Sequence, residues 1–91
     1  MNGVQCRMAR AALGLTVKQL TEMAEVSHDT VVRFENGQEL KPRTITSIRT
    51  ALEAAGVIFV DENGEGPGVR LKKDRAAAAI PVDQLNAEND E

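Results

Sequence analysis

Two short helix patterns near the middle of the chain are separated by only three residues. The first begins at Thr16, which forms a capping box with Gln19 in its Thr-x-x-Gln form. The second begins after Ser27, an N-cap residue, and ends at Gly37, which allows a left-handed stop. A connection as short as 25–27 does not let two helices lie antiparallel, so we expect them to cross steeply.

The second of these helices has one apolar face and one polar face. Val31 and Phe34 are three residues apart and therefore lie on one side. The side chains that point elsewhere belong to His28, Asp29, Val32 and Arg33. A helix that exposes hydrogen-bond donors and acceptors at its N-terminal end fits the major groove of DNA. We therefore interpret residues 27–37 as a candidate DNA recognition helix.

Helix patterns on both sides of this pair complete a small helical domain. The segment 2–13 and the segment that ends at Gly56 each have an apolar stripe at spacings of three and four, formed by Cys6, Ala9 and Leu13 and by Ile45, Ile48 and Leu52. In the helix that follows Thr16, we expect the side chains of Leu20, Met23 and Ala24 to face the core. The 42% hydrophobic content includes two Phe and no Trp or Tyr, which suits closely packed helices. The sequence predicts a mainly α fold, with a four-helix domain over 1–56.

The pattern changes from helical to extended after Gly56. A β-branched and aromatic run over 57–60 and an alternating segment over 69–72 flank a turn cluster rich in Gly. We expect an antiparallel hairpin over 57–73. An isolated two-stranded hairpin is marginally stable in water, so we expect it to form the interface of a homodimer through Val57, Ile58, Phe59, Val60, Val69 and Leu71.

The last segment, 74–91, is acidic and has little periodic apolar character, so we expect a flexible tail that another regulatory protein could bind. The chain has 11 basic and 14 acidic residues, a formal net charge of −3. The acidic excess lies after residue 56, because residues 1–56 carry seven basic and six acidic groups. The front part of the chain can therefore present a basic face to a nucleic acid.

Residue counts also limit the function classes. The chain has one Cys and one His, so it cannot assemble a disulfide, a zinc cluster or a Ser-His-Asp arrangement by itself. We expect neither an enzyme nor a site for a metal or other cofactor. No apolar run approaches the roughly 20 residues of a membrane span, and the first residues lack the order of a signal peptide. We expect a cytoplasmic protein that does not contact membranes.

Residues 2–56 resemble the Cro/CI-like (XRE) helix-turn-helix regulators. The resemblance depends on motif residues in matching order and spacing: Gly14-Leu15-Thr16, Leu20, Ala24, Val26-Ser27, Thr30-Val31, Phe34-Glu35-Asn36-Gly37 and Pro42. It implies an ion pair between Arg10 and Glu35 that joins the first helix to the recognition helix. It also implies base contacts from His28, Asp29 and Arg33, and phosphate contacts from Thr16, Lys41 and Arg43.

The chemistry of these residues leaves some roles open. The guanidinium of Arg33 matches the two acceptors of guanine, whereas Asp29 can accept from cytosine N4 or simply complement the helix dipole. Thr30 is placed with the base contacts through its methyl group, but its hydroxyl can equally cap the turn. We add Lys18 and Ser27 to the expected phosphate contacts.

The chain departs from the family pattern at three places. The family has Gly where this chain has Glu25, at a turn position with positive φ, and a residue other than Gly costs about 1 kcal/mol there. Thr21 replaces a common Ala, and its hydroxyl can bond a carbonyl one turn back. The hairpin replaces the fifth helix, so the helical dimer contact of the family does not carry over.

Two function classes follow. The first is a sequence-specific transcriptional regulator, a repressor that binds an inverted-repeat operator in double-stranded DNA as a dimer. The alternative is a protein-binding helix-turn-helix module, an antitoxin or antiactivator that acts through the hairpin and the acidic tail. Glu25, Asp29 and the negative net charge favour the alternative, whereas Lys41 and Arg43 favour DNA.

Overall fold

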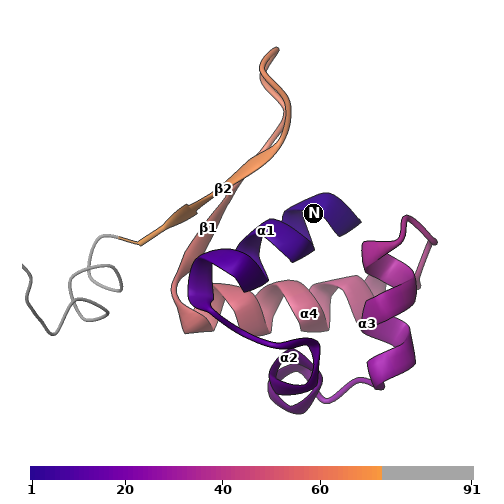
Figure 1. Ribbon diagram of the computed structural model, residues 1–91. Coiled ribbons are helices and arrows are strands. Elements are labelled where there is room, and N and C mark those ends of the chain that lie inside the picture. The colour runs from indigo at the N-terminus through magenta and orange to yellow at the C-terminus, as the bar shows by residue number, and fades with distance from the viewer. Residues whose placement is uncertain (73–91) are drawn as a thin grey trace, which may run out of the picture.

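The computed structural model describes residues 1–72, which form four helices and one antiparallel hairpin (Figure 1). The elements are α1 Gly3–Leu13, α2 Val17–Ala24, α3 His28–Glu35, α4 Pro42–Ala55, β1 Val57–Val60 and β2 Gly68–Leu71. The mainly helical architecture with a C-terminal hairpin is confirmed, although β2 begins one residue earlier than expected. The tail expected over 74–91 lies outside the described residues.

Side-chain caps fix where the first helices begin. The Thr16 hydroxyl accepts from the Gln19 backbone N–H at 3.0 Å, and the Gln19 side chain accepts from the Thr16 N–H at 2.8 Å, which confirms the predicted capping box. Asn2 and Gln5 form the same reciprocal pair at the start of α1, at 2.8 and 2.9 Å. These bonds satisfy amides of the first turn that have no partner within the helix.

The helices enclose one apolar core. Its buried members are Cys6, Ala9, Leu20, Ala24, Val31, Phe34, Ile48, Leu52, Val57 and Phe59. Met23 was expected to face inward, but it is 42% exposed. The buried residues of α2 are Leu20 and Ala24, four positions apart, so this short helix buries a narrow stripe with Met23 at its edge.

The hairpin projects from the helical body, and its loop lies at the far end (Figure 1). The register pairs Val57 with Leu71 and Phe59 with Val69, so these four residues share one face. Val57 and Phe59 are buried in the core of their own chain, and the Arg49 guanidinium lies 5.4 Å from the Phe59 ring centre. The prediction that these two side chains form a dimer interface is therefore wrong, because alternation turns them inward and leaves Ile58 exposed.

Gln5 joins the hairpin to α1. Its side chain is buried, and its amide nitrogen donates to the carbonyl oxygens of Val60 and Gly68, both at 3.1 Å. These two residues are paired across the strands at the loop end of the hairpin. One side chain thus fixes both strands to the first helix.

Candidate functional site

α3 lies at one edge of the helical body and crosses α2 steeply, as the short connection predicted (Figure 1). Val31, Phe34 and Glu35 are buried, and their spacings of three and four place them on one side of the helix. The exposed charged and imidazole side chains of the helix are His28, Asp29 and Arg33. The candidate recognition helix therefore buries one face and presents polar groups on the other.

The connection between α2 and α3 depends on a residue in a left-handed conformation. Glu25 has φ 58° and ψ 45°, and it is the only residue other than Gly with positive φ among residues 1–72. Its N–H bonds the carbonyl of Thr21, and the Thr21 hydroxyl bonds the carbonyl of Lys18 at 2.6 Å. Both departures from the family pattern thus have the local geometry expected of them.

Ser27 and Thr30 together cap the first turn of α3. The Ser27 hydroxyl oxygen accepts from the Thr30 N–H at 3.0 Å, and the two hydroxyl oxygens lie 2.7 Å apart in a hydrogen bond. This geometry favours the capping role of Thr30, whose methyl group remains for an apolar contact. His28 and Asp29, the two residues between Ser27 and Thr30, are exposed.

Asp29 and Arg33 form an ion pair one turn apart on the exposed face. The Arg33 Nε lies 2.9 Å from Asp29 Oδ2, and the two side chains are 48% and 75% exposed. The carboxylate therefore holds one edge of the guanidinium and leaves the two terminal nitrogens for other acceptors. A guanidinium presented in this way can donate two parallel hydrogen bonds to a planar acceptor.

The C-terminal end of α3 is held by a buried carboxylate. Arg10 donates to Glu35 through Nε at 2.7 Å and through Nη2 at 2.8 Å, so the ion pair implied by the family resemblance is present. The Cys6 thiol donates to the same carboxylate at 3.4 Å. Arg7, which sequence reasoning did not include, donates to the Glu35 carbonyl at 3.2 Å and so satisfies part of the helix end.

These contacts shift three ionisation equilibria. Burial alone would raise the pKa of Glu35, but hydrogen bonds from Arg10 and Cys6 and the positive charges of Arg10 and Arg7 outweigh burial and lower it. The hydrogen bond to Glu35 raises the pKa of Arg10. Burial, followed by the charge of Glu35, raises the pKa of the Cys6 thiol to about 12. Cys6 therefore remains a protonated donor in the core at neutral pH.

Gly3 lets α1 approach the end of α3 closely. A Cβ atom at this position would collide with the Phe34 carbonyl oxygen and would lie 3.1 Å from Glu35 Cα. Sequence reasoning gave Gly3 no role, because nothing near it in the sequence indicates contact with α3. The absence of a side chain here is what allows the two backbones to touch.

The expected phosphate-contact residues lie at the starts of three helices. Thr16 and Lys18 belong to the start of α2, Ser27 caps α3, and Lys41 and Arg43 flank Pro42 at the start of α4. All five are exposed. Within the described part of the chain no direct hydrogen bond or ion pair joins these side chains to one another.

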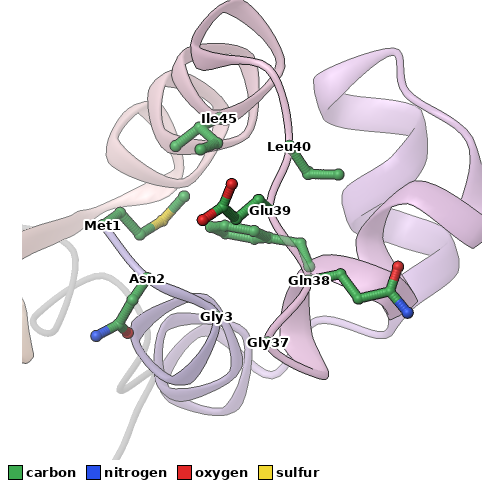
Figure 2. Close-up of a pocket in the computed structure, with 9 residues that line it drawn as sticks. Met1, Asn2, Gly3, Gly37, Gln38, Glu39, Leu40 and Ile45 are labelled. Carbon is green, nitrogen blue, oxygen red and sulfur yellow. The ribbon is translucent and has the colours of Figure 1, made fainter.

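A pocket of about 350 Å³ lies at the C-terminal end of α3. Figure 2 shows Met1, Leu40 and Ile45 around this space, with the Glu39 carboxylate reaching into it. Glu39 is the one ionisable side chain among its lining residues. The charged groups of α3 and of the start of α4 lie outside its lining.

Among residues 1–72, no group of three His, Cys, Asp or Glu side chains is placed to hold a metal ion. The helices of this described part are all too short or too polar to cross a membrane. The sequence matches no protein-family model, and no curated protein is significantly similar to it.

Proposed function

We propose that this protein is a sequence-specific DNA-binding regulator of the Cro/CI-like helix-turn-helix type. In this proposal it acts in the cytoplasm as a dimer on an inverted-repeat operator, and it represses by occupying DNA that polymerase needs. The observation that supports the proposal most is the asymmetry of α3: one face is buried through Val31, Phe34 and Glu35, while His28, Asp29 and Arg33 are exposed.

The recognition step follows from the chemistry of these side chains. With α3 in the major groove, the two terminal nitrogens of Arg33 donate to O6 and N7 of a guanine. Asp29 orients Arg33 and accepts from a neighbouring cytosine, His28 donates to a base or phosphate, and the Thr30 methyl group faces a thymine.

The backbone contacts set the position of the domain on the duplex. Lys41 and Arg43, both exposed at the start of α4, neutralise phosphates beside the same half-site. Thr16, Lys18 and Ser27 contact phosphates from the starts of α2 and α3. Because phosphates carry no sequence information, these residues supply affinity for any DNA, whereas Arg33 supplies discrimination.

The test begins with selection of a genomic DNA pool on the purified protein, which we expect to enrich an inverted repeat. On the enriched site, Arg33→Ala should lose about 1 to 3 kcal/mol of binding free energy but almost none on random DNA. Arg43→Ala should weaken binding to both DNAs, and it should reduce the slope of log binding constant against log salt concentration by about one. Fluorescence anisotropy at several salt concentrations measures both effects, with circular dichroism as the check of folding.

Two outcomes would count against this function. Equal losses on both DNAs for Arg33→Ala would remove its role in reading bases. A folded wild-type protein that enriches no site would favour the protein-binding module, an antitoxin or antiactivator whose partner contacts the hairpin and the acidic tail.

A further inference from the structure

The second strand of the hairpin has an open edge. The Lys72 N–H donates to the Gly56 carbonyl at 2.8 Å, and this pair continues the register in which Val57 faces Leu71. Hydrogen-bonded and non-bonded pairs alternate in an antiparallel ladder, so Val69 and Leu71 direct their backbone groups away from β1. Within residues 1–72 no other backbone group bonds them. A strand edge of this kind is a template for pairing with another strand.

β2 is also the less buried of the two strands. Val57 and Phe59 anchor β1 in the core, whereas Gly68 and Val69 of β2 are half-buried and the end of β2 is exposed. Leu71 is 39% exposed even though its partner Val57 is fully buried. A second strand placed along β2 would cover Leu71 without disturbing the core.

The charges of the hairpin are separated along its length. The loop carries Asp61, Glu62 and Glu65, and the opposite end, near the helical body, carries Arg70 and Lys72. When two copies of such a strand pair antiparallel, the loop of one lies beside the base of the other. The hairpin is therefore electrostatically complementary to a second copy of itself.

We propose that two chains associate through antiparallel pairing of their β2 edges about a two-fold axis at Val69. This arrangement specifies the dimer of the proposed function, but it does not require DNA. A register centred on Arg70 would place two arginines opposite each other, and one centred on Leu71 would place Arg70 opposite Lys72. Both are repulsive. The register centred on Val69 places Arg70 opposite Gly68 of the second copy and brings Lys72 to its acidic loop.

Sedimentation of the full chain without DNA tests the charge pairing. We expect a reversible dimer that Lys72→Glu and Glu65→Lys each weaken about tenfold, and that the double variant restores. Lys18→Glu and Glu22→Lys, which make the same changes of net charge on α2, are the matched controls and should leave the dimer constant unchanged. A chain that stays monomeric at high micromolar concentration, or single variants that behave like their controls, would overturn the proposal.

A cysteine scan tests the register. Paired residues on the axis have Cα atoms about 5.5 Å apart, within the range of a disulfide. With oxidised glutathione, Val69→Cys should form a covalent dimer faster than Arg70→Cys or Leu71→Cys, and the buried Cys6 of the wild type should form none. Fastest linkage at position 70 or 71 would contradict the register. These assays contain no DNA, so they can fail while operator binding stands, and operator binding can fail while they succeed.

Discussion

Two arginine–carboxylate ion pairs involve α3, one buried and one on its exposed face, and they lie in different surroundings. At the C-terminal end, the Arg10 and Glu35 side chains are 19% and 5% exposed and join two helices. On the exposed face, Arg33 in the last turn and Asp29 in the first turn are 48% and 75% exposed and belong to one helix. Breaking a buried pair leaves a desolvated charge, whereas an exposed pair exchanges its partner for water at little cost. The first pair therefore holds the helix and the second remains available to a partner.

The largest effect should come from removing the buried carboxylate. Glu35→Ala leaves Arg10 and the Cys6 thiol without their acceptor, and we expect the free energy of unfolding to fall by about 3 kcal/mol. Urea unfolding followed by circular dichroism measures it. Glu39→Ala, which removes an exposed acid four residues on, is the control and should change stability by less than about 0.5 kcal/mol.

Acid should break the same pair in the unmodified protein. Because the folded-state pKa of Glu35 is lowered from 4.5, its contribution is fully present above about pH 4.5 and is lost as the pH falls through the folded-state value. In Glu35→Gln, the free energy of unfolding should therefore fall less steeply as the pH is lowered below about 4.5. An equally steep fall in Glu35→Gln would mean that other carboxylates cause the loss.

Gly3→Ala should be the next largest change, and it acts on the same end of α3. The added methyl group collides with the backbone of Phe34, which cannot rotate away, so we expect a loss of about 2 kcal/mol. Gly68→Ala adds the same group where no atom lies within 4 Å and is the matched control. Equal stability of the two variants would show that the helices separate at little cost.

The caps of α2 and α3 could be predicted from the sequence, because each depends on residues within one turn. The left-handed conformation of Glu25 was expected only from the family resemblance, since no residue near it in the sequence indicates it. The double role of Gln5 could not be predicted, because its acceptors lie 55 and 63 residues away. The inward face of β1 could not be predicted either. All residues of the run 57–60 are apolar, so no alternation marks Val57 and Phe59 as core.

In the connection between α2 and α3, Glu25→Gly should stabilise the protein. Gly has no Cβ penalty at φ 58°, so we expect a gain of about 1 kcal/mol in the free energy of unfolding. Glu25→Ala removes the carboxylate but keeps the Cβ atom, and it should gain much less. If both variants gained equally, the charge of Glu25 and not its backbone conformation would be the cause.

The smallest effect should be the stability contributed by the exposed pair. A double-mutant cycle with Asp29→Ala and Arg33→Ala should give a coupling of about 0.3 to 0.5 kcal/mol in urea unfolding. The same cycle with Arg10→Ala and Glu35→Ala should give a coupling several times larger. Equal couplings would remove the contrast between the buried and the exposed ion pair.

The two hydrogen bonds that Gln5 donates to the carbonyl oxygens of Val60 and Gly68 fix the orientation of the hairpin relative to α1. β1 follows α4 through Gly56 alone, and α1 touches α3 at Gly3, so no flexible linker separates the strands from α3. If two hairpins pair, the two α3 helices of the proposed dimer are therefore held at a fixed separation. DNA offers the same face once per turn, roughly every 34 Å. Operators whose half-sites are moved by one or two base pairs should therefore lose affinity abruptly, and Gln5→Ala should soften that dependence.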